Sequence, residues 1–161
     1  MTVSVELRTL HYLARAGALS HSDRQRYDDN RADLLARLLR GQASGYLSRR
    51  RSPRVPRALG VRMKDADKVI EGVTLQLSSG GFSMYLAELP TAALLDFALA
   101  LPDDTQLTGK ARIVGCVQHG KHAFFACLAL VDPGSDQRAR LEDVVLDATI
   151  ENSFDRNADA A

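Results

Sequence analysis

The spacing of apolar residues divides the chain into a helical first part, a middle part that alternates like strands, and a helical last part. The segment from Ser22 to Arg40 is predicted to be a helix because its apolar residues form one stripe: Tyr27, Leu34, Leu35, Leu38 and Leu39. Ser22 and Gln25 predict a capping box, and Gly41 ends the helix. A second helix with poorer caps is expected from Val5 to Ala16. The two helices are expected to form a hairpin.

Beyond Pro56 the period changes to two, which predicts strands. Val73, Leu75 and Leu77 alternate with polar residues, so we expect these three side chains on one face. The predicted strands are Val73 to Ser78, Phe82 to Leu86, Phe97 to Leu101, Gly109 to Gln118 and His122 to Val131. One further strand before Val73 brings the total to about six. Short, locally connected strands favour a small antiparallel barrel, because closure removes the exposed edges.

A last helix is predicted to begin at Ser135, since its apolar residues recur at helical spacing: Leu141, Val144, Val145 and Ala148. The residues from Asn152 onward are polar and predict a frayed tail. The fold class expected is therefore mainly β with flanking helices. We divide the chain into an N-terminal helical extension (1–47), a barrel domain with its C-terminal helix (48–151) and a polar tail (152–161).

The composition agrees with a soluble domain that buries a core. The chain has 161 residues, of which 45% are hydrophobic and 25% charged, as in ordinary globular proteins. No apolar run approaches the roughly 20 residues that a membrane-spanning helix needs, and the first residues lack the order of a secretory signal. Two cysteines, Cys116 and Cys127, are expected to be apolar fillers of neighbouring strands. A cytoplasmic location is the expectation.

Positive charge is concentrated in one segment of an almost neutral chain. Between Ser48 and Arg57 the sequence has five arginines, whereas the whole chain has 21 basic and 20 acidic residues. Arginine presents planar pairs of donors that match phosphate oxygens and the O6/N7 edge of guanine. Pro53 and Pro56 exclude a regular helix here, so Arg50 and Arg54 are expected on a bent, extended strap. Such a strap predicts a phosphate-bearing ligand or an acidic partner, although a solvated basic linker is the alternative.

A second polar group follows on the predicted strand before the glycine turn. Gln76 and Ser78 are two residues apart and therefore share a face. Gly80 and Gly81 follow them, where missing side chains let a ligand approach the backbone. A flat polar ligand is expected to lie there, and a plain hairpin with a polar outer face is the alternative.

Together the two segments resemble the PilZ domain family, whose mark is RxxxR followed about twenty to thirty residues later by [D/N]xSxxG. Arg50-Arg51-Ser52-Pro53-Arg54 supplies the first motif, and Gln76-Leu77-Ser78-Ser79-Gly80-Gly81 supplies the second with one substitution. The resemblance covers roughly Ser48 to Leu146. It implies a six-stranded antiparallel barrel that binds the bacterial second messenger cyclic di-GMP, without cofactor, metal or catalysis.

Carried over by position, the resemblance implies a ligand site made of Arg50, Arg54, Gln76, Ser78 and Gly81, with Arg49 and Arg51 as helpers. Ligand binding is then expected to fold the strap onto the barrel and to reorient the N-terminal helices toward a protein partner. Gln76 departs from the family's Asp or Asn, so it lacks the charge of Asp and has a longer side chain than either. Weaker binding is expected, and an adaptor that binds proteins without the nucleotide is the alternative.

Other chemistries find less support in the sequence. Cys116, His119 and His122, with Cys127 nearby, have the donor types of a zinc site, but His119 falls in a predicted turn and we expect no metal there. No nucleophile elbow, P-loop or dinucleotide fingerprint is present. Nucleic acid is an unlikely partner, because the chain has no Trp, only nine Phe or Tyr residues and no wide basic face.

Overall fold

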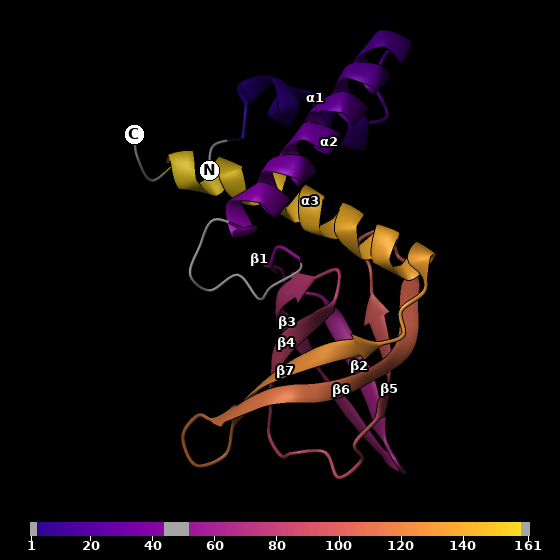
Figure 1. Cartoon of the computed structure of the whole chain (residues 1–161), viewed down its shortest axis with the longest axis vertical. Coiled ribbons are helices and arrows are strands. Elements are labelled where there is room, and N and C mark those ends of the chain that lie inside the picture. The colour runs from indigo at the N-terminus through magenta and orange to yellow at the C-terminus, as the bar shows by residue number, and fades with distance from the viewer. Residues whose placement is uncertain (1–2, 44–51, 159–161) are drawn as a thin grey trace. The chain divides into compact units, whose positions relative to one another are not determined.

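The computed structural model describes residues 3–43 and 52–158, and these fall into two compact units. One unit consists of helices and combines Met1–Pro53 with Val145–Ala161. The other consists mainly of strands and runs from Arg54 to Val144. Figure 1 labels the helices and strands of both units. No helix in the described ranges combines the length and the apolar character needed to cross a bilayer.

The first helix, α1 (Val5–Arg15), is well defined at both ends. The Ser4 hydroxyl accepts a hydrogen bond from the backbone N–H of Leu7 and caps the N-terminus. At the other end Gly17 has a φ of 68°, and Ala18 donates a hydrogen bond to the carbonyl of Leu13. This Schellman arrangement favours glycine. The predicted helix is confirmed, and the expectation that its caps are poor is wrong.

The second helix, α2 (His21–Ala43), begins one residue before the predicted start and continues past Gly41. Its cap is Ser20, whose hydroxyl accepts the backbone N–H of Asp23 at 3.1 Å and donates to the Asp23 carboxylate at 2.6 Å. The predicted capping box of Ser22 and Gln25 is therefore wrong, because an equivalent pair lies two residues earlier.

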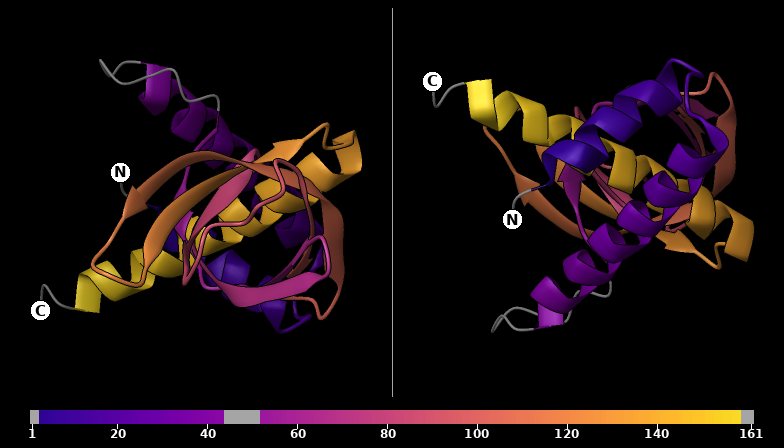
Figure 2. Two further views of the ribbon diagram at one scale, coloured as in Figure 1. Left: turned by 90° about the horizontal axis from the view of Figure 1, so that it is seen from below. Right: turned by 90° about the horizontal axis from the view of Figure 1, so that it is seen from above.

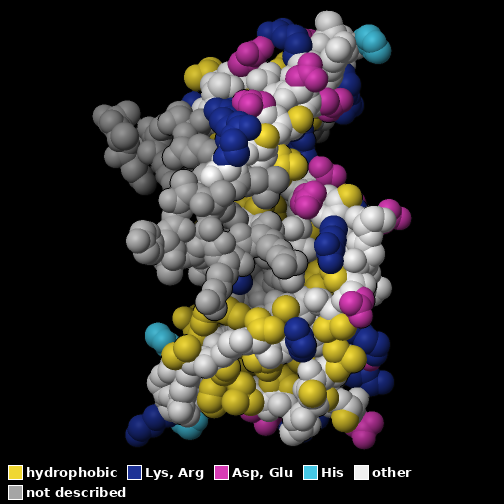
Figure 3. Space-filling model, viewed as in Figure 1, with side chains coloured by type: hydrophobic (Ala, Val, Ile, Leu, Met, Phe, Trp, Pro, Cys, Tyr) yellow, Lys and Arg dark blue, Asp and Glu magenta, His cyan; other side chains and the backbone are white. Residues whose placement is uncertain are grey.

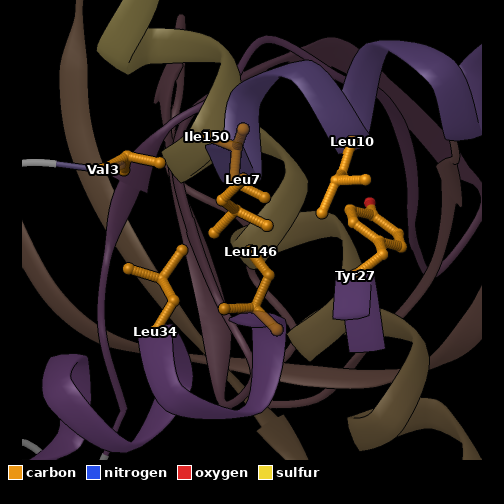
Figure 4. Close-up of a cluster of buried hydrophobic side chains, with 7 residues drawn as sticks. All are labelled: Val3, Leu7, Leu10, Tyr27, Leu34, Leu146 and Ile150. Carbon is orange, nitrogen blue, oxygen red and sulfur yellow. The ribbon is translucent and has the colours of Figure 1, made fainter. Parts of the chain in front are cut away.

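Apolar side chains from three helices, together with Val3 just before α1, form the core of the helical unit (Figure 4). The third helix, α3 (Ser135–Ala158), begins in the barrel unit and ends in this one. It therefore extends well into the segment from Asn152 that we expect to be frayed. The buried cluster consists of Val3, Leu7, Leu10, Tyr27, Leu34, Leu146 and Ile150. The residues from α3 complete a core that the predicted helical hairpin alone does not provide.

A polar network is built into this core. His11, 4% exposed, lies with Nδ1 2.8 Å from the Tyr27 hydroxyl, to which Arg31 also donates a hydrogen bond of 3.0 Å. Arg31 forms an ion pair with Asp147, and Nε2 of His11 lies 3.7 Å from the Glu151 carboxylate. Burial raises the pKa of the Tyr27 hydroxyl. Burial alone lowers the pKa of Arg31, but the hydrogen bond and charge of Asp147 raise it above its ordinary value, so both groups stay protonated.

Six antiparallel strands close into a barrel in the second unit, and a short seventh strand adds to it. The strands are β1 (Val55–Pro56), β2 (Gly60–Asp65), β3 (Lys68–Ser78), β4 (Gly81–Leu86), β5 (Leu95–Ala100), β6 (Gln106–Gln118) and β7 (Phe124–Val131). Their order is β1-β3-β2-β5-β6-β7-β4, and the pairing of β3 with β4 closes the ring. Figure 2, left, shows these strands from below. The predicted six-stranded barrel is confirmed.

The barrel encloses a core of aliphatic residues around two aromatic rings. Phe82 and Phe97 meet edge to face with ring centroids 5.8 Å apart. Beside β2, both carboxylate oxygens of Asp65 accept backbone hydrogen bonds of 2.8 Å, one from Thr91 and one from Ala92. These bonds hold the loop that precedes β5. They also lower the pKa of Asp65, because they stabilise its charged form.

Candidate functional site

The chain just after the first predicted motif pairs with the strand that holds the second motif, because β1 pairs with β3. In this antiparallel ladder Val55 lies opposite Leu77, and Pro56 lies opposite Gln76. Arg54 directly precedes Val55, the first residue of this ladder. Arg54 is exposed. The structure therefore brings the last arginine of the first motif beside the second motif, whereas Arg49, Arg50 and Arg51 lie outside the described residues.

A bulge in β3 determines which side chains face outward at the site. The register with β4 shifts between Thr74 and Gln76, so the simple alternation is interrupted at Leu75. Leu75 is 37% exposed, whereas Leu77 is 1% exposed. Our expectation that Val73, Leu75 and Leu77 lie on one face is therefore wrong, since Val73 is also exposed, at 53%, and Leu77 is buried.

Thr74 occupies the inward position instead and connects β3 to the chain between β1 and β2. Its hydroxyl donates to the carbonyl of Arg57 at 2.5 Å and accepts the backbone N–H of Leu59 at 3.0 Å. The backbone N–H of Thr74 also donates to the carbonyl of Leu59. These bonds anchor the chain just after β1, and so they hold the arginine-bearing segment at its C-terminal end.

Ser78 and Gly81 flank the turn between β3 and β4. The Ser78 hydroxyl, in a residue 6% exposed, donates to the carbonyl of Gly81 at 3.1 Å. Gly81 has a φ of 157°, and a Cβ there would lie 2.0 Å from the carbonyl oxygen of Leu128 on β7. Glycine is therefore required by the close approach of β7. The sequence did not predict this reason, because it depends on a strand more than forty residues away in the chain.

Two cross-strand rows, each with three small residues, lie on the outer face of the barrel. In the first row Gln76 on β3 lies opposite Ser83 on β4, which lies opposite Cys127 on β7 and then Gly115 on β6. The second row is Ser78, Gly81, Ala129 and Arg112. Residues that are directly opposite in a ladder share a face. The outer face beside Gln76 and Ser78 therefore has few large side chains, and the exposed Arg112 lies at the other end of the second row.

An apolar row borders these small residues. Tyr85, Phe125 and Val117 lie opposite one another on β4, β7 and β6. Tyr85 is 47% exposed, and its ring centroid lies 5.9 Å from that of Phe125 and 5.6 Å from that of His119. Figure 3 shows apolar side chains gathered on this face of the barrel. Sequence reasoning missed this aromatic group, because Tyr85 and Phe125 lie on strands that are distant in sequence.

The other candidate chemistry does not assemble. In the described ranges, His, Cys, Asp and Glu side chains form no group of three or more suited to a metal ion. Cys116 is exposed and Cys127 is half-buried, and both are free thiols. A hollow of about 510 Å³ lies over β2, β5 and β6, and its lining residues belong to neither motif. The outer face of β3, β4, β7 and β6 is therefore the candidate site.

The barrel and the two motif segments lie in a part of the chain that matches a known family. Residues 48–147 match the family model described as PilZ domain. The chain belongs to the PilZ domain family. The family expected from Arg50, Arg54, Ser78 and Gly81 is confirmed. None of the curated proteins compared with the chain matches it.

Solved structures of low sequence identity share the fold. The inhibitor of motility MotI/DgrA of Bacillus subtilis is 18% identical, with a TM-score of 0.57 over 64% of this chain and 52% of that one. The PilZ domain of YcgR from Escherichia coli, solved with c-di-GMP, is 17% identical, with a TM-score of 0.54 over 70% of this chain and 99% of that one. MrkH of K. pneumonia is 17% identical, with a TM-score of 0.54 over 68% of this chain and 54% of that one. The chain thus spans about half the length of two of these proteins.

Proposed function

We propose that this protein is a cytoplasmic receptor for cyclic di-GMP that acts by binding, without catalysing a reaction, and passes the signal to a protein partner. The observation that carries the proposal is the β1–β3 ladder, in which Pro56 lies opposite Gln76. This pairing holds the end of an arginine segment beside a strand on which Gln76 is exposed. Family membership and the c-di-GMP complex of a structural neighbour support the choice of ligand.

Each proposed contact follows from the chemistry of the group. The guanidinium groups of Arg50 and Arg54 would each bind a phosphate or the O6/N7 edge of a guanine, with Arg49 and Arg51 adding positive charge. Gln76 would accept a hydrogen bond from the guanine N1–H or N2–H₂ group. Because the Ser78 hydroxyl donates to Gly81, it would act toward the ligand only as an acceptor.

Transmission to a partner is proposed to use the N-terminal helices. In α1, Val5 is 70% exposed and Tyr12 is 72% exposed, and with Arg8 and Thr9 they line a shallow hollow of about 370 Å³. Apolar side chains this exposed on one helix face favour contact with another protein. The same feature supports the second candidate function, an adaptor that uses this face and does not bind the nucleotide.

Titration calorimetry with cyclic di-GMP tests the proposal. We expect saturable binding that weakens about tenfold or more in Arg54→Ala and in Arg50→Ala, since each removes charge-assisted hydrogen bonds. Arg62→Ala is the matched control, because Arg62 is exposed on β2 and pairs with Glu71 away from the site. No heat and no thermal shift at several hundred micromolar ligand would exclude the receptor and leave the adaptor.

A further inference from the structure

Ser83 is a buried polar residue on the outward side of β4. The residue is 2% exposed, although its neighbours Phe82 and Met84 point into the barrel core. Its hydroxyl has no hydrogen-bond partner among the residues that the structure describes. A buried hydroxyl without a partner destabilises a protein, so native structures usually supply a partner from the protein, an ordered water or a ligand.

The cross-strand neighbours of Ser83 show what can satisfy this hydroxyl. Gln76 lies opposite it on β3, and Cys127 lies opposite it on β7. Directly opposed residues have Cβ atoms roughly 4.5 to 5.5 Å apart, which is within reach of a glutamine side chain. A thiol is a weak hydrogen-bonding group, whereas a side-chain amide is a strong donor and acceptor. Gln76 is thus the stronger of the two cross-strand partners.

We propose that Ser83 is a positioning residue for Gln76, which rests on the function proposed above. In the ligand-bound state the Ser83 hydroxyl accepts a hydrogen bond from the side-chain NH₂ group of Gln76. The amide is then fixed with its carbonyl oxygen directed at the guanine. Glutamine has one more rotatable bond than aspartate or asparagine. The hydrogen bond to Ser83 restricts this additional freedom, which ligand binding would otherwise have to remove.

The proposal makes stability and affinity change in different directions. Ser83→Ala removes an unsatisfied hydroxyl, so the melting temperature of the ligand-free protein is expected to stay the same or rise. The affinity for cyclic di-GMP is expected to fall about three- to tenfold, as for the loss of one hydrogen bond. Ser78→Ala is the contrasting control, because its hydroxyl already donates to Gly81 and its loss should lower the melting temperature.

A double-mutant cycle separates positioning from direct contact. Calorimetry on the full chain compares the wild type, Ser83→Ala, Gln76→Ala and the double variant. If Ser83 acts through Gln76, its substitution has no further effect once Gln76 is alanine. Ser83→Cys keeps the side-chain size and is expected to bind like Ser83→Ala.

Each outcome of the cycle distinguishes the two proposals. An equal loss of affinity from Ser83→Ala with and without Gln76 overturns the positioning role. So does a wild type that binds cyclic di-GMP while Ser83→Ala binds it equally well, and in both cases the receptor function stands. A wild type that does not bind the nucleotide overturns the receptor function, and the positioning role with it.

Discussion

Buried polar side chains have different hydrogen-bond partners in the two units of this molecule. In the helical unit the Tyr27 hydroxyl bonds to Nδ1 of His11 and to Arg31, and Arg31 also pairs with Asp147, whereas Nε2 of His11 has no hydrogen-bond partner among the described residues. On the outer face of the barrel, Ser83 is equally buried but has no partner in the described part of the chain. The difference is that His11 keeps one hydrogen bond within its network, whereas the Ser83 side chain has none, so Ser83 is the side chain available to a ligand or to a residue that contacts one.

The largest effect is expected from Gly81→Ala, which tests how closely the candidate face is packed. A Cβ at this position would overlap the Leu128 carbonyl, so β4 and β7 must separate. We expect a loss of about 3 kcal/mol or more in the free energy of unfolding, measured by denaturant titration. Gly120→Ala is the control, since Gly120 also has a positive φ but a Cβ there would meet no atom within 4 Å. Similar losses in both variants would mean that backbone conformation, and not the contact with β7, is the constraint.

A smaller loss is expected in the helical unit from Arg31→Leu. This change leaves the Asp147 carboxylate without its ion pair inside a partly buried network. The expected cost is about 1 to 3 kcal/mol in the free energy of unfolding, because Asp147 keeps some access to solvent. Arg26→Leu is the matched control on the same helix, and its exposed pair with Glu6 predicts a change below about 1 kcal/mol. Equal effects would remove the distinction between the interior network and the surface.

Gln76→Asp tests the barrel side of the comparison through affinity. A carboxylate accepts charge-assisted hydrogen bonds from guanine, which are roughly twice as strong as neutral ones. We therefore expect cyclic di-GMP to bind about three- to tenfold more tightly, as measured by calorimetry. Gln76→Asn is the control without the charge. Unchanged or weaker binding in the Asp variant would mean that Gln76 does not contact the base.

Asp65 gives the smallest expected effect and sharpens the comparison, because it is a barrel residue whose polar atoms are fully engaged. Backbone hydrogen bonds from Thr91 and Ala92 lower its pKa, so its contribution to stability is complete at neutral pH and is lost as the pH falls through the folded-state value. Melting temperatures measured between pH 7 and pH 2 should therefore fall less steeply on the acid side in Asp65→Asn. An acid limb identical to that of the wild type would contradict this role.

Much of the fold follows from local sequence patterns. The helices around Leu7 and Leu34, the strands on either side of Gly80 and the β6–β7 hairpin all lie where their periodicity predicts. The caps were harder to predict, because Ser20 and Ser22 are both plausible and only the geometry of the turn distinguishes them. Leu146 and Ile150 of α3 pack in the helical unit, which is a tertiary contact that local patterns do not show, and the helix continues to Ala158.

The candidate site was only partly predictable. Arg54, Gln76 and Ser78 were identifiable because a motif fixes their spacing in sequence. The bulge at Leu75 was not, since a one-residue shift in register changes the face of every later residue and depends on the partner strand. Ser83 and Tyr85 gave no signal of their own, and they join the site only through their pairing with β3 and β7.

The helical unit is built from the two ends of the chain, and this affects the order in which its parts are synthesised. Its first two helices are translated before the barrel, whereas Leu146 and Ile150 follow only after the whole barrel unit, Arg54 to Val144, has been added. At a synthesis rate of about 5 to 20 residues per second, this interval lasts roughly 5 to 20 s. During that time Leu7 and Leu34 lack their partners from α3. The nascent helical hairpin therefore exposes an apolar surface until the last helix leaves the ribosome, which makes it a candidate substrate for chaperones.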